Sequence, residues 1–450
     1  MTCLHRFVAL ALLGLAWTPI ARADDPPPFV QPAVDDPMLA PPPQDGSVVR
    51  TWDEALALIR QSPDFLTSVA GVERAMAQHR IALAAVLPTL TGTGSYTHNF
   101  ITTSIPFGTA TLVEPPATVW AASATASWNI VNPRGLYALH TSDLATDVAK
   151  LSLADRRRVL ATAVVSAMLS TLAAARVAEL DRVGLRSALE RLVLTQTRLK
   201  FARGTELDVD RAQQDVAAAR ALLISGDESL RQSREALGQV LGSATPLSAP
   251  AELDLAGFER AVTSTCRLAS SVDKRPDVAA ANERVAIAQR QIEDVKLQFV
   301  PTLAVGSTAA YATEVTLGPN DTWTIGATIT VPLYDGGARY GALRDANAAA
   351  EQARDALTTL RVDALIETAR ATRAVSVDTA ARDVAKEQRD LAERIDARTR
   401  QGYASGLGTS LDLVTSAQAL RQAEINLVLL EFELAQARAG AVLVNAECVY

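Results

Sequence analysis

The chain has 450 residues and a formal net charge of −7, with 48% hydrophobic, 21% charged and only 5% aromatic residues. A compact enzyme of this length usually carries more aromatic side chains in its core. Abundant alanine, leucine, arginine and glutamine is instead typical of long helices and coiled coils. Acidic residues outnumber basic ones, so the composition does not indicate a positively charged surface for nucleic acid, and we expect no nucleic-acid partner.

The first 23 residues have the pattern of a signal peptide. Two basic side chains, His5 and Arg6, precede an apolar run over 7–17, and Ala21-Arg22-Ala23 matches the A-x-A cleavage signal. The apolar run is too short for a lasting membrane anchor. We predict an exported protein cleaved after residue 23; the alternative is an uncleaved N-terminal helix.

The segment 24–50 is rich in proline and acidic residues, which predicts an extended tether. Helical periodicity begins after the capping residue Thr51. The mature chain has no run of 18 apolar residues, so any part that enters a membrane should do so as β-strands. No cysteine stands at the predicted mature N-terminus, so we expect no lipid anchor.

An internal repeat organises the rest of the chain. Leu87-Pro88-Thr89-Leu90 is matched 213 residues later by Val300-Pro301-Thr302-Leu303, and a threonine-rich and glycine-rich stretch follows each. Leu207-Asp208-Val209 is matched in turn by Leu411-Asp412-Leu413. Because the order of motifs agrees, we predict two similar halves. They cover 51–245 and 276–444, joined by a linker at 246–275 and followed by a tail at 445–450.

Each half contains two stretches in which apolar and small or polar residues alternate. They predict the β-hairpins 90–131 and 303–333, with strands near 90–104, 117–131, 303–315 and 322–333. Alternation with weak hydrophobicity is what a barrel wall needs, and about 10 residues suffice for a tilted crossing. An ordinary soluble hairpin is the alternative.

Long helices follow each hairpin. Proline is absent from 135–201, and from 338–401 as well, so each range predicts one helix of about 100 Å. Each ends at a turn that starts a second helix, over 208–241 and 411–440. Such helices need neighbours in a bundle or in a ring of subunits to bury their apolar faces.

Turn residues connect the strands to the long helices. Asn132-Pro133 ends the first hairpin, and Pro332 with Asp335-Gly336-Gly337 ends the second. Proline suits a strand end because it cannot donate to a central ladder. Asn and Asp suit the bend and can cap the next helix.

These motifs make the chain resemble the TolC-like outer-membrane efflux protein family (outer membrane factors) from about Thr51 to Val444. The matching features are Val331-Pro-Leu-Tyr-Asp-Gly-Gly337, the Pro-Thr-Leu at each first strand, and the Gly…Leu-Asp motifs at 204–209 and 406–413. The resemblance implies a mixed α and β membrane protein: a homotrimer giving four strands per subunit to a transmembrane β-barrel, continuous with a long α-helical coiled-coil barrel. Four strands alone cannot close a barrel, so assembly is required in any case.

The resemblance also implies a function. It is that of an outer-membrane duct of a Gram-negative cell, extending into the periplasm, in a tripartite efflux or type I secretion system. The partners would be a periplasmic adaptor, an inner-membrane pump and outer-membrane lipid. Small-molecule efflux is our first expectation and polypeptide export the second. The rival interpretation is a periplasmic coiled-coil adaptor or structural protein without a pore, which would not need two matched hairpins.

The helix tips are the expected gate. By resemblance, Asp412 takes a pore-ring position, Thr415 replaces a second ring aspartate, and Asp208 takes the matching place in the first half. Tyr403 matches a tyrosine that ties closed tips together, while the arginine that often assists it falls at Gly408. The alternative for the aspartates is helix N-capping, which Asp does well.

Cys266 and Cys448 fall near the expected equator of such a duct, and we hypothesise a disulfide between them; two free thiols are the alternative. Other chemistry is not expected. His79, His98 and His140 lack metal-ligand spacing, and no phosphate loop, nucleophile elbow or catalytic carboxylate pair stands out. The sequence therefore predicts no enzyme, no metal and no cofactor.

Overall fold

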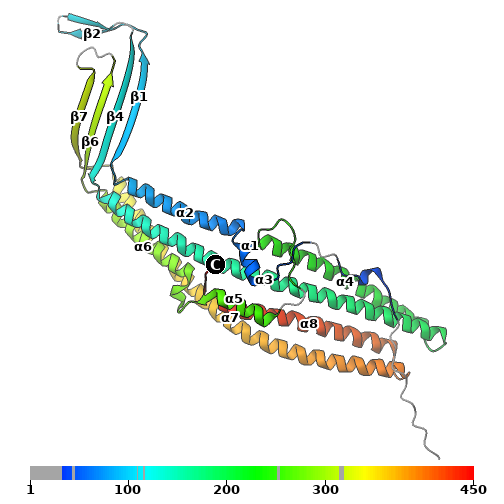
Figure 1. Ribbon diagram of the computed structural model, residues 1–450. Helices are drawn as coiled ribbons and strands as arrows, with labels where there is room; N and C mark the ends of the chain where they lie inside the picture. Colours follow the sequence, from blue (N-terminus) through cyan, green and yellow to red (C-terminus); the bar gives the residue numbers. More distant parts are fainter. Residues whose placement is uncertain (1–32, 43–45, 109, 115–116, 251–253, 314–318) are drawn as a thin grey trace, which may run out of the picture.

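The computed structural model describes residues 33–42, 46–108, 110–114, 117–250, 254–313 and 319–450. The predicted signal peptide and the start of the proline-rich segment lie outside these residues. The described chain is elongated, with a β-sheet at one end and the turns of two helical hairpins at the other (Figure 1). We call the end formed by these turns the tip.

Four strands form one antiparallel sheet in the order β1-β4-β6-β7. The two halves meet where β4 pairs with β6, with Thr125 opposite Thr308. β1 and β7 are the edge strands, and both are free in the single chain. The bounds are Thr89–His98 for β1, Thr118–Val131 for β4, Thr302–Ala312 for β6 and Asp321–Thr330 for β7.

The first predicted strand, 90–104, is wrong at its outer end. β1 stops at His98, and β2 (Thr103–Phe107) and β3 (Ala110–Glu114) pair with each other as a separate two-stranded sheet. In the connection between β1 and β2, Phe100 and Ile101 are 82% and 80% exposed. Alternation continues on both sides of this break, so the pattern could not separate one long strand from two.

The helices follow the same order in both halves. A helix enters the sheet, a long helix leaves it, and a further helix returns from the tip. In the first half these are α2 (Pro63–Ala84), α3 (Pro133–Lys200) and α4 (Glu206–Val240); in the second they are α6 (Pro276–Leu297), α7 (Ala338–Ala404) and α8 (Ser410–Leu443). α3 has 68 residues and α7 has 67, so each alone spans about 100 Å.

The main core lies midway along the molecule. It joins α1 (Trp52–Ile59) to α3, α4 and α8 around fully buried side chains such as Ile59, Met168 and Leu443. The indole Nε1 of Trp52 donates to Thr265 Oγ1 at 3.1 Å. One stretch of α3 is long and apolar enough to cross a membrane, but 56% of it is buried inside the chain. We therefore interpret this part of α3 as a core helix.

The predicted linker and tail are folded parts of this core. The range 246–275 contains α5 (Leu255–Thr265), β5 (Cys266–Leu268) and the short turn η2 (Val272–Lys274). The tail 445–450 supplies β8 (Ala446–Cys448), which pairs antiparallel with β5. Prolines interrupt the helical pattern here, but the segment between them still buries apolar side chains.

The described part of the proline-rich segment is docked on the helices, a contact that the prediction of an extended tether did not include. Asp36 accepts a bond of 2.7 Å from Arg220 on α4. Met38 and Leu39, in the turn η1 (Pro37–Leu39), pack against a buried cluster between α3 and α4. The buried Asp36 pairs with Arg220, and the partly buried Met38 and Leu39 add apolar contacts, so both kinds of contact hold this segment against the helices.

Candidate functional site

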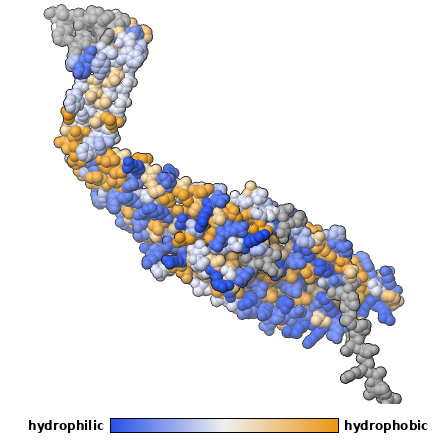
Figure 2. Space-filling view, in the orientation of Figure 1, coloured by the Kyte–Doolittle hydropathy of each residue, from blue (hydrophilic) through white to orange (hydrophobic). Residues whose placement is uncertain are grey.

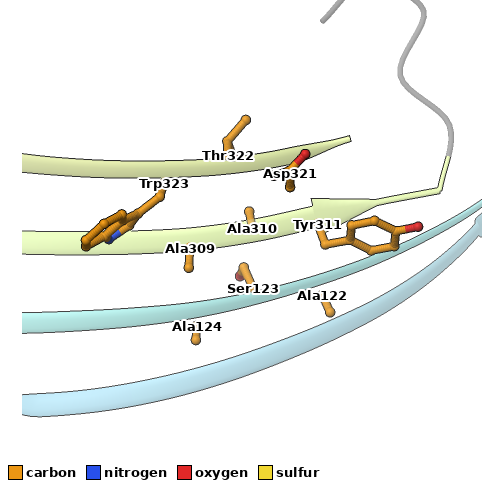
Figure 3. A pocket seen from close by; sticks show the side chains of 9 residues that line it. All are labelled: Ala122, Ser123, Ala124, Ala309, Ala310, Tyr311, Asp321, Thr322 and Trp323. Atoms are coloured by element: carbon orange, nitrogen blue, oxygen red, sulfur yellow. The ribbon is translucent and has the colours of Figure 1, made fainter. Parts of the chain in front are cut away.

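The sheet has two chemically different faces. Successive side chains of a strand point to opposite sides, and the cross-strand register aligns them in rows. One side, which we call the hydroxyl face, collects threonine and serine side chains; they are Thr89, Thr91, Thr93, Ser95, Thr97, Ser123, Thr125, Ser127, Thr302, Thr308, Thr322, Thr324, Thr328 and Thr330. In Figure 3, Thr322 and Ala310 point to this side, and Ala309 and Trp323 point away from it.

The opposite side, the aromatic face, carries every aromatic ring of these four strands. Tyr96, Trp120, Tyr311 and Trp323 lie toward the outer end, and Trp128 lies toward the helices. The rings of Tyr96 and Trp120 are 4.8 Å apart. Aliphatic and small residues fill the space between the two levels. An apolar band bordered by aromatic rings is how the outer wall of a membrane barrel meets lipid.

Hydrophobic side chains also gather where the sheet meets the helices (Figure 2). Leu333 and Tyr334 are 89% and 88% exposed there, and Val331 is 51% exposed. The surface of the helical body is far more hydrophilic in the same view. An exposed apolar collar at this level marks a surface that meets lipid or another subunit.

The predicted turn residues lie together at this junction. Asn132 caps α3 by accepting from the Gly135 N–H at 3.0 Å, and Pro133 takes the first helical position. Asp335 accepts from the Gly337 N–H at 3.1 Å. Gly336 and Gly337 have φ of 70° and 92°, a region that favours glycine. β7 has already ended before Pro332.

The sequence interpretation missed Arg339, which organises the second turn. Its guanidinium pairs with Asp335 at 2.7 Å and donates to the Pro332 carbonyl at 3.2 Å. It also lies 4.5 Å from the centre of the Phe299 ring. The spacing of four residues between Asp335 and Arg339 on a helix start was the available signal.

At the tip, Asp208 and Asp412 each occupy the third position of a helix. Their N-caps are Thr205 and Thr409, and both pairs form a capping box. Asp412 Oδ2 accepts from the Thr409 hydroxyl at 2.7 Å and from its N–H at 3.2 Å. These hydrogen bonds hold the pKa of Asp412 below its ordinary value. The aspartates are therefore partners of threonine N-caps, and are not N-caps themselves.

At the tip, the turns of the two helical hairpins touch one another through Asp208. Its second carboxylate oxygen accepts from the hydroxyl of Ser410, at the start of α8. This bond, assisted by those from Thr205, lowers the pKa of Asp208 despite partial burial. Asp412 remains exposed, and the Thr415 hydroxyl donates back to the Leu411 carbonyl at 2.9 Å. The structure thus brings Asp208 to the second hairpin and leaves Asp412 at the surface.

Tyr403 does have an arginine partner, although Gly408 cannot provide one. Arg198, at the end of α3, places its guanidinium carbon 4.0 Å from the Tyr403 ring centre. Its Nη2 donates to the Tyr403 carbonyl at 2.6 Å. Arg198 lies 205 residues away in sequence and on the other half, so motif comparison at 406–413 could not find it.

A buried polar cluster links the same helices deeper in the body. Arg191 on α3 pairs with Asp215 on α4, and their side chains are almost fully buried. Gln418 on α8 donates to the other oxygen of Asp215 at 2.9 Å. The first hairpin is therefore bonded to α8 both at the tip and two helical turns further along.

Cys266 and Cys448 are joined by a disulfide that connects β5 to β8. The bond lies in the main core, far from both the sheet and the tip. Of the three histidines that the sequence gave no reason to regard as metal ligands, His79 and His140 both lie near Asp143, and His98 contacts Thr118 on the sheet. Within the described ranges, no group of three or more histidine, cysteine or acidic residues could hold a metal ion.

An open sheet with an aromatic face, continued by helices of more than 60 residues, defines the class of outer-membrane ducts. The family model described as outer membrane efflux protein matches residues 56–243 and 268–441. The chain belongs to this family, and it is an efflux duct of the Gram-negative outer membrane. The family is one of channels and not of enzymes, and the rival interpretation as an adaptor is thereby set aside.

Relatives and solved structures agree with this assignment. The chain is 26% identical over 416 residues to the pyoverdine export outer membrane protein OpmQ of Pseudomonas aeruginosa, covering 88% of this chain and 87% of that protein. It is 26% identical over 301 residues to the fusaric acid resistance protein FusA of Burkholderia cepacia, covering 62% and 54%.

The fold resembles that of VceC from Vibrio cholerae, with a TM-score of 0.73 at 20% identity, covering 87% of this chain and 95% of that one. It also resembles the CmeC channel of Campylobacter jejuni, with a TM-score of 0.74 at 15% identity, covering 93% and 92%. At this level of identity, these structures are evidence for the fold alone.

Proposed function

We propose that three copies of the chain close their sheets into one twelve-stranded barrel, with the helices forming a tunnel beneath it. The observation that carries the proposal is the pair of free edge strands, β1 and β7, in a sheet of four. Closed barrels need about eight strands or more, and a membrane leaves no edge unpaired. Pairing β7 of one copy with β1 of the next satisfies both edges by symmetry.

Assembly is tested by fractionating cells and heating the protein in detergent. We expect the chain in the outer-membrane fraction as a species three times the monomer mass, which heating converts to monomer. Recovery of a monomer in the soluble periplasmic fraction would refute the proposal.

We further propose that the duct passes small organic molecules, in a tripartite system with a periplasmic adaptor and an inner-membrane pump. Support comes from the matched relatives, which are named for pyoverdine export, fusaric acid resistance, and solvent and toluene efflux. The test is a strain without other ducts that carries the pump and adaptor genes neighbouring this one. Expression of the chain should lower accumulation of a fluorescent small substrate. Secretion of a polypeptide without that effect would favour type I secretion instead.

The tip is proposed as the gate, with Asp412 facing the pore and Thr415, Asp208 and Tyr403 around it. Asp412 is exposed, keeps a low pKa, and uses only one carboxylate oxygen in its capping box. Three such carboxylates around an axis would attract and hold multivalent cations.

Single-channel recording tests this assignment. Asp412→Ala and Asp412→Asn should raise conductance and weaken block by divalent or trivalent cations, while Asp412→Glu, which keeps the charge, should retain the block. Unchanged conductance and block in the Ala and Asn variants would refute the gate assignment.

A further inference from the structure

We propose that the barrel section of the duct is a charge-free, hydroxyl-lined conduit, which passes anionic, cationic and neutral polar solutes alike. Selection by charge then takes place in the helical section. The inference rests on the trimeric barrel proposed above and concerns what its inner wall is made of.

The choice of inner face follows from the register of the sheet. The aromatic face carries Tyr96, Trp120, Trp128, Tyr311 and Trp323, with aliphatic residues between them. Ile325 and Ile329, on the same side, are 68% and 69% exposed in the single chain. Only lipid accommodates such a surface, so the hydroxyl face must turn inward.

The hydroxyl face is neutral along its whole described length. Fourteen of its residues are threonine or serine, as named above. The other positions that share their rows are Val119, Ala121, Asn129, Ala304, Gly306, Ala310, Ala312 and Gly326. None of these described residues carries an ionisable group, so a permeating ion meets no charge fixed to this wall.

The hydroxyls form an ordered polar lining. Thr93 pairs with Ser123 at 2.7 Å, Thr89 with Ser127 at 2.8 Å, and Thr125 with Thr308 at 3.2 Å. Cross-strand pairs of this kind stabilise a sheet. A hydroxyl is both donor and acceptor, so the lining can exchange hydrogen bonds with water or solute of either charge.

The charged residues at the two ends of the sheet lie outside this wall, and those at the junction with the helices, Asp335 with Arg339 and Arg134 with Asp294, are paired with each other. The side chain of Asp321, at the outer end of β7, belongs to the aromatic face. Asp412 lies at the tip, beyond the 67 residues of α7. Screening reduces electrostatic influence within about 8 Å at physiological ionic strength. One added charge per subunit should therefore dominate the ion selectivity of the barrel.

The test uses Thr324→Cys on the hydroxyl face and Ile325→Cys on the aromatic face, in full-length protein in planar bilayers under a KCl gradient. The native cysteines are in a disulfide, so the unsubstituted chain is the control for background reaction. Thr324→Cys is treated with an anionic or a cationic thiosulfonate. The anionic reagent should raise the cation-to-anion permeability ratio about threefold, and the cationic reagent should lower it by a similar factor.

Ile325→Cys should not react from the aqueous phase. Reaction of Ile325→Cys in place of Thr324→Cys would overturn the face assignment. Modification of Thr324→Cys without a shift in permeability ratio would show that another fixed charge governs the barrel, and would overturn neutrality. Either result leaves the pore itself in place. Absence of any pore in the unsubstituted chain would instead refute the trimeric duct, and the inference with it.

Discussion

The guanidinium of Arg198 stacks on the ring of Tyr403 at 4.0 Å and donates to the carbonyl of the same residue at 2.6 Å. The two residues lie in the last turns of the two longest helices, α3 and α7, so one side chain bonds the ends of both helical hairpins. The contact uses the flat face of the guanidinium and one of its N–H groups together, which lysine cannot reproduce.

Arg198→Ala should loosen the tip. Loss of the stacked and hydrogen-bonded contact is expected to cost about 1–2 kcal/mol, which is roughly a five- to thirtyfold change in the population of the separated tips. Single-channel recordings should show a higher resting conductance. Tyr403→Phe keeps both the ring and the carbonyl and should behave as the unsubstituted chain does; equal effects of both substitutions would contradict this account.

Asp215→Ala should destabilise the helical body strongly. Asp215 is 2% exposed and Arg191 is 9% exposed, so removal of the carboxylate leaves a buried guanidinium without its partner. The expected loss is about 3–5 kcal/mol, measured by denaturant unfolding or heat modification. Asp210→Ala, at an exposed position of the same helix, should change stability by less than about 0.5 kcal/mol. Similar losses in both variants would argue against the buried pair.

Asp181 and Asp208 should make opposite contributions to the pH dependence of folding stability. Burial raises the pKa of Asp181, against the opposing charge of Arg421. A raised pKa in the folded state means that stability falls as pH rises from the ordinary pKa through the folded one. Asp181→Asn should therefore raise the melting temperature at neutral pH, by about 2 °C, and have little effect in acid, where both states are protonated.

For Asp208, the hydrogen bond from Ser410 lowers the pKa. Its contribution to stability is present above the ordinary pKa and is lost as pH falls through the lowered one. Asp208→Asn should therefore lower the melting temperature at neutral pH, and the difference should shrink in acid. Melting curves of both variants across pH test the pair; the same sign for both would contradict the environments described here.

Removing the disulfide should weaken the main core. Cys266 and Cys448 are 182 residues apart in sequence, so the bond restricts a large loop of the unfolded chain. Replacing both by serine is expected to cost about 2–4 kcal/mol. The unsubstituted chain should lose a similar amount on reduction, whereas the double variant should be indifferent to reductant. If reductant also destabilised the double variant, the loss of stability could not be assigned to this disulfide.

Local patterns gave the elements of this fold with small errors. The helix predicted over 135–201 is α3, Pro133–Lys200, and Asn132 and Thr51 are caps as expected. Periodicity and capping act within a few residues, so they are legible in sequence. The break after His98 and the folded linker were missed, because alternation resumes beyond the break and because prolines conceal a short buried helix.

Motif order and local periodicity were enough to predict the parts of the chain: two halves, four alternating strands, long helices and the capped turns between them. The contacts between residues far apart in the sequence became visible only in the folded chain. Arg198 stacks on Tyr403, Ser410 donates a hydrogen bond to Asp208, and Cys266 bonds to Cys448. Sequence spacing says nothing of such pairs, because they depend on how two halves pack side by side. The neutral hydroxyl face arises in the same way: alternation placed the threonines on one side of each strand, and the register of four strands brought them into a single wall.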